Sequence, residues 1–261
     1  MATKTPPNYV ESHNLLEGKV VLVTAAAGTG IGSAVARRCI EEGATVIISD
    51  VHEKRLEDTC DALGQINGER PLSIVCDVTE EQQVQNLFDK TIEQYGKLDV
   101  LINNAGLGAQ SLLVEMEDEE WSRVIDVTLN GTMRCTRAAL KKMQDKKAGV
   151  IVNNASVLGW RAQTGQSHYA AAKAGVMALT RCVAIEAAEY NIRVNCVAPS
   201  LAMHPNLAKS SNQELIDSLI EREALGRAAE PWEVANVMVF LASDYSSYMT
   251  GEVISVSSQH P

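Results

Sequence analysis

The sequence predicts an α/β fold, a single Rossmann-type doubly wound domain built around a seven-stranded parallel sheet. Short apolar segments alternate with segments of helical spacing along nearly the whole chain, and the apolar segments are apolar at every position instead of every second one. Strands of that kind are typical of parallel sheets, whose two faces are covered by the helices of right-handed βαβ units. The length of 261 residues suits one such domain, and no stretch has the composition of a linker.

The first strand and helix illustrate the pattern. A β-branched strand at 19–24 leads into three glycines. The helix that follows at 33–42 places Val35 and Cys39 on one face and ends at a glycine. The same alternation repeats to the end of the chain. Further strands are expected at 45–49, 72–76, 98–103, 150–154, 193–198 and 253–256, and further helices at 53–63, 80–95, 119–144, 167–189 and 231–243.

The N-terminal segment and one long insertion stand apart from this alternating pattern. Residues 1–17 are polar, contain two prolines and lack the apolar core of a signal peptide, so we expect a flexible arm on a cytoplasmic protein. The domain proper is expected at 18–261. Its longest insertion, 200–227 after the sixth strand, is predicted to be a substrate loop, because ligands bind at the carboxyl ends of such strands.

Composition excludes several classes of partner. The chain carries 23 basic and 33 acidic side chains, a net charge of −10, which repels phosphate backbones, so no nucleic-acid partner is expected. No apolar run is long enough to cross a membrane, and no membrane partner is expected. The six cysteines are scattered without metal-ligand spacing, so no metal site is expected.

The glycine-rich turn after the first strand predicts a dinucleotide site. Gly28 and Gly30 let the backbone approach a pyrophosphate, which the free N–H groups at the start of the next helix would bind. Asp50 stands twenty positions after Gly30, where a carboxylate accepts ribose hydroxyls and repels a 2′-phosphate. No Lys or Arg lies between residues 24 and 33 or at Val51, so NAD is favoured and NADP is less so. The alternative is a plain turn with Asp50 on the surface.

A tyrosine and a lysine predict the chemistry. Tyr169 and Lys173 are four positions apart in a predicted helix and therefore lie on one face, where the ammonium would lower the pKa of the phenol. Tyr169 is thus a candidate general acid–base. Ser156 follows the fifth strand, where its hydroxyl could hold a substrate carbonyl. The alternative is a solvated helix face.

Taken together these motifs resemble the short-chain dehydrogenase/reductase family over about residues 17–257. Ser156 precedes Tyr169 by thirteen positions, which is the family interval. The other matching segments are the cofactor loop at Thr24 to Gly32, the pair Asp77-Val78, the segment Asn103 to Gly106, and the carboxyl-terminal segments Leu225 to Arg227 and Thr250-Gly251.

The resemblance implies hydride transfer between a nicotinamide and an alcohol/carbonyl pair, in a homotetramer. Tyr169 would exchange the proton, Ser156 would bind the carbonyl oxygen, and Lys173 would hold the ribose. The implied cofactor contacts are Gly28, Gly30, Ile31, Asp50, Asp77, Val78, Asn104, Tyr169, Lys173 and Ala202.

The chain departs from the family pattern at several positions, among them the carboxyl end, where Ser257-Ser258-Gln259 stands at a usual Asp-Gly-Gly. The cofactor loop is one residue longer, with Ala25 at the usual first glycine. Thr128 stands at the usual asparagine, which holds a water of the proton relay, so Thr128 is the fourth candidate catalytic residue, with its hydroxyl ordering that water. Ser200 replaces a glycine after the sixth strand. His204 stands at a usual threonine and could contact the cofactor or cap the loop.

The substrate is less defined. The chain looks most like bacterial 3-oxoacyl-thioester reductases and hydroxysteroid or hydroxyacyl dehydrogenases. Lys209, Arg161 and Arg222 could meet an anionic carrier such as CoA, or lie on the surface as solvated charges. A bulky apolar substrate pocket or a packed core is expected from Leu158, Trp160, Leu201, Met203, Leu207, Leu215, Leu219 and Ile220.

The expected function is therefore an NAD(P)-dependent oxidoreductase acting on an alcohol/ketone pair, either a 3-oxoacyl thioester or a bulky alicyclic, steroid-like molecule. Two alternatives stay open. An epimerase or dehydratase on the same fold would use Tyr169 and Lys173 on a nucleotide sugar. A non-catalytic NAD-binding sensor would keep the cofactor site without turnover.

Overall fold

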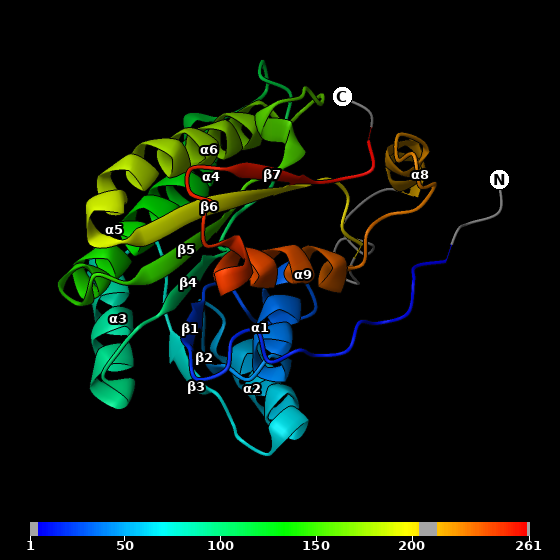
Figure 1. Cartoon of the computed structure of the whole chain (residues 1–261). Helices are drawn as coiled ribbons and strands as arrows, with labels where there is room; N and C mark the ends of the chain where they lie inside the picture. The colour runs from blue at the N-terminus through cyan, green and yellow to red at the C-terminus, as the bar shows by residue number, and fades with distance from the viewer. Residues whose placement is uncertain (1–4, 204–212, 260–261) are drawn as a thin grey trace.

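A computed structural model describes residues 5–203 and 213–259 and contains one seven-stranded parallel sheet (Figure 1). The strand order is β3-β2-β1-β4-β5-β6-β7, which confirms the predicted doubly wound fold. The carboxyl ends of all the strands lie along one edge of the sheet. The strands are β1 (Val20–Val23), β2 (Thr45–Asp50), β3 (Leu72–Val75), β4 (Val100–Asn103), β5 (Gly149–Asn154), β6 (Ile192–Pro199) and β7 (Val253–Val256).

Helices cover both faces of the sheet. The layer of α1, α2 and α9 packs on one face and the layer of α3, α5 and α6 on the other (Figure 1). The long helices are α1 (Ile31–Glu41), α2 (Glu53–Asn67), α3 (Glu81–Tyr95), α4 (Asp118–Ile125), α5 (Gly131–Met143), α6 (Ser167–Ala187), α8 (Gln213–Glu221) and α9 (Pro231–Ala242). The short 3-10 helices are η2 (Gln144–Lys146), η3 (Val157–Gly159), η4 (Ala188–Tyr190) and η5 (Asp244–Ser246).

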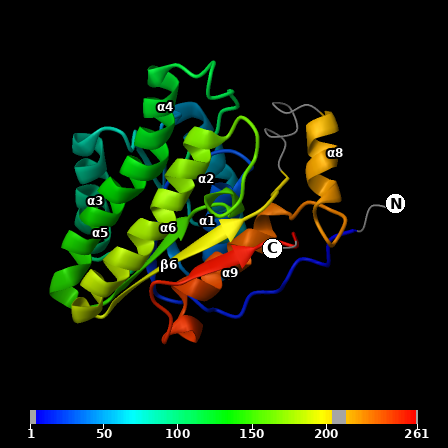
Figure 2. The ribbon, with the colours of Figure 1, turned by 90° about the horizontal axis from the view of Figure 1, so that it is seen from above.

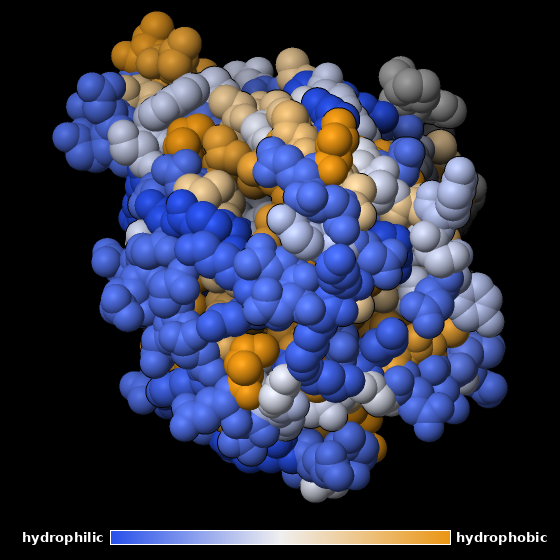
Figure 3. All heavy atoms as spheres, turned by 60° about the vertical axis from the view of Figure 1, so that its left-hand side comes forward, coloured by the Kyte–Doolittle hydropathy of each residue, from blue (hydrophilic) through white to orange (hydrophobic). Residues whose placement is uncertain are grey.

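Successive side chains of β1 show why the strands are apolar throughout. Val21 and Val23 belong to the core beneath α1 and α9, whereas Val20 and Leu22 belong to the core beneath α3 and α5. Because every position of a buried parallel strand faces one core or the other, hydrophobicity does not alternate. The outer surface of the α3–α5 layer is mostly hydrophilic, with apolar side chains in small separate spots (Figure 3).

The single helix predicted at 119–144 is interrupted. A π-helix, η1 (Asp126–Asn130), separates α4 from α5, and the Gly131 N–H donates to the carbonyl of Asp126 five positions back. Such one-turn bulges often mark functional sites. Thr128 lies in this bulge and is fully buried.

Part of the N-terminal segment is bonded to α1. Arg38 donates to the carbonyls of Val10 and Glu11, both at 2.9 Å, and forms a buried ion pair with Glu42. The other oxygen of Glu42 accepts from the backbone N–H groups of His13 and Leu15, at 2.9 and 3.0 Å. Tyr9 also packs edge-on against Trp232 of α9. These contacts lie within the segment for which the sequence predicts a flexible arm.

No helix among the described residues is long and apolar enough to cross a membrane. Within the same residues, no three His, Cys, Asp or Glu side chains gather as metal ligands would.

Candidate active site

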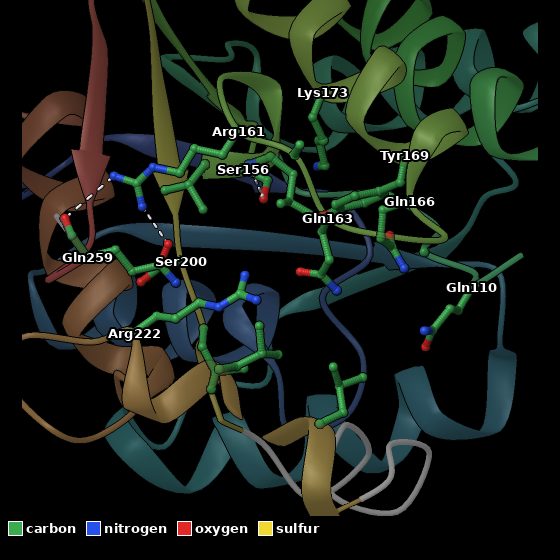
Figure 4. Close-up of a pocket in the computed structure, with 18 of the residues that line it drawn as sticks. Gln110, Ser156, Arg161, Gln163, Gln166, Tyr169, Lys173, Ser200, Arg222 and Gln259 are labelled. Atoms are coloured by element: carbon green, nitrogen blue, oxygen red, sulfur yellow. Dashed lines mark hydrogen bonds between the residues drawn. The ribbon is translucent and has the colours of Figure 1, made fainter. Parts of the chain in front are cut away.

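The three residues expected to carry the chemistry lie around one cavity at the carboxyl edge of the sheet (Figure 4). Tyr169 is in the first turn of α6, Lys173 lies one turn later, and Ser156 directly follows β5. The Lys173 Nζ lies 5.5 Å from the centroid of the Tyr169 ring and donates a 2.6 Å hydrogen bond to the carbonyl of Asn154. That bond fixes the ammonium between β5 and the tyrosine.

Burial dominates the ionisation of this pair. It raises the pKa of Tyr169 to about 12, and a hydrogen bond with the Ser156 side chain lowers it only in part. Burial also lowers the pKa of Lys173 to about 8. The raised pKa of Tyr169 is opposite in direction to the lowered pKa expected from the sequence, because desolvation of the phenolate is the largest contribution. Tyr169 is a phenol, and hence a proton donor, across the neutral range.

Ser156 has a fixed orientation. Its backbone is extended, and its Oγ accepts a 3.2 Å bond from the N–H of Leu158, so the side chain caps η3. The same hydroxyl is bonded to Tyr169, so the two side chains face one another at the cavity. A small cavity of about 160 Å³ joins Ser156 and Tyr169 to Ile31 and Ala202, two of the expected cofactor contacts.

Thr128 is placed differently from the expectation. Its Oγ1 accepts from the N–H of Leu107 at 3.0 Å and donates to the carbonyl of the same residue at 3.3 Å. A threonine hydroxyl has one proton, and here that proton is used by Leu107. The structure thus makes Thr128 an anchor for the segment after β4, and its expected role in ordering a relay water stays a prediction.

The cofactor loop is held by Asn104. Its amide donates to the carbonyls of Thr24, at 3.3 Å, and Ala25, at 2.9 Å, and its oxygen accepts from Asn154 at 3.0 Å. Ala25, at the position of the usual glycine, has a φ of +48°. A Cβ on Gly32 would come within 2.4 Å of the Ala25 carbonyl, so glycine is required there. The Asn104 side chain therefore holds the shape of the loop at residues 24–32, which was expected to contact the cofactor.

The extra loop residue is accommodated next to α2. Gly28, with a φ of +96°, donates its N–H to Thr59 of α2 at 2.9 Å. In the part of the chain that the structure describes, no side chain caps the first turn of α1, and no acid lies in that turn. The amino end of α1 thus keeps N–H groups and a positive dipole suited to a pyrophosphate.

Asp50 ends β2 with its carboxylate buried. One oxygen accepts from the N–H of Ala27 at 3.2 Å, and the other accepts from His52 at 3.0 Å. Burial raises the pKa of Asp50, while the Ala27 bond and the Arg55 charge lower it. Arg55, 4.0 Å from Asp50, is a cation beside the expected ribose site that sequence reasoning missed, because it lies in the helix and not in the loop.

The residues expected near the adenine follow β3. Asp77 accepts from the backbone and side chain of Thr79, at 2.9 and 2.7 Å, which fixes the turn. Val78 is buried against Gly131, where a Cβ would come within 2.6 Å of a valine methyl. Neither side chain lines the cavity that contains Tyr169.

The main cavity has a volume of about 640 Å³ and is less apolar than expected. Leu158, Leu201, Leu215 and Leu219 line it, whereas Trp160 is half exposed and does not. Met203 and Ile220 are also absent from its described wall, and His204, Leu207 and Lys209 lie outside the described residues. The polar lining is larger than the sequence suggested: Gln110, Gln163, Gln166, Gln259, Ser200, Arg161 and Arg222.

These glutamines were missed because they come from three segments far apart in the chain. The same holds for Glu223, a buried carboxylate behind the cavity wall. It accepts bonds from Ser258 and Gln259 in the tail after β7, and from the backbone of Leu201 after β6. The substrate side of the site is therefore assembled from the loop after β6, the end of α8 and the tail after β7 (Figure 2).

Comparison with known proteins places these features in a family. Residues 25–258 match the family model described as Enoyl-(Acyl carrier protein) reductase. The chain is 61% identical, over 100% of both chains, to the (5R,7aS)-5-hydroxy-7a-methyl-1-oxo-2,3,5,6,7,7a-hexahydro-1H-indene-carboxyl-CoA reductase of Mycobacterium tuberculosis. It is 41% identical to the 3-oxoacyl-[acyl-carrier-protein] reductase FabG of Thermotoga maritima, over 92% of this chain and 97% of that one.

A solved structure agrees with these matches. A short chain dehydrogenase from Mycobacterium smegmatis superposes with a TM-score of 0.88 at 58% identity, over 98% of this chain and 99% of that one. The chain accordingly belongs to the short-chain dehydrogenase/reductase family, whose members are oxidoreductases that use a nicotinamide cofactor.

Proposed function

We propose that the protein catalyses the NADH-dependent reduction of a ring ketone in an alicyclic acyl-CoA thioester, and the reverse oxidation of the alcohol. The observation that carries this proposal is the convergence of a protonated Tyr169, an oriented Ser156 and a buried Lys173 on one cavity. A phenol, a hydroxyl and an ammonium in that arrangement suit proton transfer to a carbonyl oxygen.

The proposed role of each residue follows from the hydrogen bonds that its side chain can still form. Ser156 can donate its hydroxyl proton to the ketone oxygen, since its lone pair already accepts from Leu158. Tyr169 gives its proton to the same oxygen as charge develops there, and Lys173 stabilises the phenolate that results. A bound nicotinamide supplies the hydride to the carbonyl carbon, so the ketone gains one hydride and one proton and becomes an alcohol.

NAD is proposed over NADP on account of Asp50. Its buried carboxylate would repel a 2′-phosphate and accept ribose hydroxyls. Arg55 partly offsets the negative charge of the Asp50 carboxylate. It is half exposed, however, so solvent screens it more than it screens Asp50.

The substrate class rests on similarity and on the cavity. The 61% identical relative is named for a bicyclic carboxyl-CoA molecule, and the described lining offers both leucines and hydrogen-bonding amides. A linear 3-oxoacyl thioester is the second candidate, favoured by the FabG relative. The leucines after β5 and in α8 suit a compact ring system.

Assays with the two thioester classes test the proposal. We expect NADH oxidation with a bicyclic oxo-carboxyl-CoA to exceed that with a linear 3-oxoacyl-CoA. NADH binding without turnover of either class would instead support the sensor, and conversion of a nucleotide sugar would support the epimerase alternative.

We also propose a homotetramer in the cytoplasm. Ile185 of α6 is 81% exposed, and Phe240 of α9 and Tyr248 after η5 are exposed as well. These side chains are the kind that a subunit contact covers. Light scattering after size exclusion measures the assembly, and a monomer at micromolar concentration would overturn this part.

A further inference from the structure

A second cavity extends the catalytic one away from Tyr169. It has a volume of about 320 Å³ and is lined by Gln110, Ala162, Gln163, Thr164, Leu215 and Arg222. All of these except Thr164 also line the main cavity, so the two spaces share a wall and meet beside α8. A substrate whose ketone reaches Tyr169 can therefore continue into the second space.

The combined lining is positively charged, although the protein is acidic. Among the described residues that line the two cavities, the ionisable ones are Tyr169, Lys173, Arg161 and Arg222, and none is Asp or Glu. The whole chain has a net charge of −10. A local excess of arginine on such a molecule favours an anionic ligand at this place.

The two arginines differ in what they already bind. Arg161 donates to both the side chain and the backbone carbonyl of Gln259, and Gln259 in turn donates to Glu223 at 3.0 Å. Arg161 thus holds the tail after β7 in place. It is a positioning residue for the cavity wall, and two of its donors are used by Gln259.

Arg222 follows α8 and has its donors free. In the described part of the chain its guanidinium has no hydrogen bond or ion pair, and Figure 4 shows it extending toward Gln163 across the cavity. The adjacent carboxylate of Glu223 does not neutralise it, because Glu223 points the other way, to Leu201, Ser258 and Gln259. A guanidinium with free donors at a cavity junction is well suited to a phosphate, which it can bind with two parallel bonds.

We propose that the second cavity binds the phosphopantetheine arm of a CoA thioester and that Arg222 binds a phosphate group of the CoA. This inference rests on the proposed function and adds the position of the carrier. The amides of Gln110 and Gln163 can pair with the two amide groups of the arm, and Leu215 can pack on its methylene groups. CoA is favoured over a carrier protein, since the 61% identical relative is named for a carboxyl-CoA substrate.

Thioesters of one oxo-acyl group on three carriers test the proposal: CoA, pantetheine without phosphate, and N-acetylcysteamine. For Arg222→Gln we expect KM for the CoA thioester to rise about tenfold or more, as for a lost charge-assisted hydrogen bond, with kcat nearly unchanged. KM for the two phosphate-free thioesters should stay as in the wild type. Lys90→Gln, which removes one positive charge from the exposed side of α3, is the matched control and should change none of them.

An unchanged KM for the CoA thioester in Arg222→Gln, or an equal rise for all three carriers, overturns the inference. A carrier-protein thioester that is turned over better than the CoA thioester overturns the choice of CoA. If the wild type reduces none of the thioesters, the proposed function fails. The carrier site is then tested by calorimetry with free CoA, which should bind the wild type about tenfold more tightly than Arg222→Gln, with pantetheine equal for both. Equal binding of CoA would overturn the site on its own.

Discussion

The hydroxyl of Thr128 is bonded to both backbone polar groups of Leu107, so a residue in the π-helix η1 holds the segment that leaves β4. That segment continues into Gly108 and Gln110, which line the catalytic cavity. The bulge between α4 and α5 is thereby connected to the cavity wall by one side chain.

Replacing Thr128 with valine tests the anchoring role. The Leu107 N–H would lose its partner inside the protein, which costs about 1–3 kcal/mol of unfolding free energy. Turnover should fall because the cavity wall loosens, and Thr128→Ser should restore both properties. Urea denaturation and the pH–rate profile are the measurements. A profile whose shape changes in Thr128→Val would instead assign the hydroxyl to the proton relay.

Tyr169→Phe should bind NADH as the wild type does and lose most turnover, by about 10²–10⁴-fold, because only the proton donor is removed. Fluorescence titration and steady-state rates measure the two effects. Tyr245→Phe is the matched control, since Tyr245 is 76% exposed, and it should retain full activity. A Tyr169→Phe enzyme near full activity would mean that the site is elsewhere.

The cofactor preference should depend on Asp50. The wild type is expected to favour NADH over NADPH by at least about tenfold in kcat/KM, or about 1.4 kcal/mol. Asp50→Ala combined with Val51→Arg should reduce that ratio, because Val51 is half exposed beside the carboxylate and its replacement can reach a phosphate. Arg55→Ala should raise the ratio. Equal use of both cofactors by the wild type would contradict the assignment.

The rate of ketone reduction should fall above about pH 8. The Lys173 ammonium, with its pKa lowered to about 8, is charged below that pH and becomes neutral above it, whereas Tyr169, at about 12, stays protonated throughout. We therefore expect kcat/KM to be level below about pH 7 and to decline through pH 8. In Lys173→Arg the residual activity should lack this decline, because a guanidinium keeps its charge. A level wild-type profile up to about pH 10 would rule out Lys173 as the titrating group.

The stability of the N-terminal contacts should depend on Arg38 and not on Arg37. The Arg38 side chain is 5% exposed and pairs with a fully buried Glu42, so Arg38→Ala leaves a buried carboxylate without its cation and should cost about 3–5 kcal/mol. Arg37 pairs with Glu41 at 2.8 Å on the surface, where such pairs contribute about 0–1 kcal/mol. Denaturant unfolding of the two variants measures the difference, and similar losses would contradict it.

The sheet could be predicted closely from the sequence, since each strand lies within two residues of its expected bounds. Strands buried on both faces have a continuous apolar signal that depends only on neighbouring residues. The π-helix at Asp126–Asn130 could not be predicted in this way, because hydrophobic spacing does not record one extra residue in a helical turn.

The residues of the candidate site fall into two similar groups, those with a local sequence signal and those placed by long-range packing. Ser156, Tyr169 and Lys173 could be proposed because their spacing is local and their chemistry is distinctive. The bond from Leu107 to the hydroxyl of Thr128 could not be foreseen, since the position of Leu107, 21 residues away in the chain, depends on the packing of α5 against β4. The bond between Gln259 and Arg161, which are 98 positions apart, could not be predicted, since it also depends on long-range packing.

Ala25 has consequences for how the nucleotide loop acquires its shape. An alanine with a φ of +48° is locally disfavoured, by roughly 1–2 kcal/mol, so the residues around it do not select this turn by themselves. The turn is held by Asn104, which is 79 positions away and is brought near only when β4 pairs with β1. An isolated peptide spanning β1, the loop and α1 lacks those bonds. The shape of this turn is thus a product of long-range strand pairing, and it can be completed only after β1 and β4 have paired.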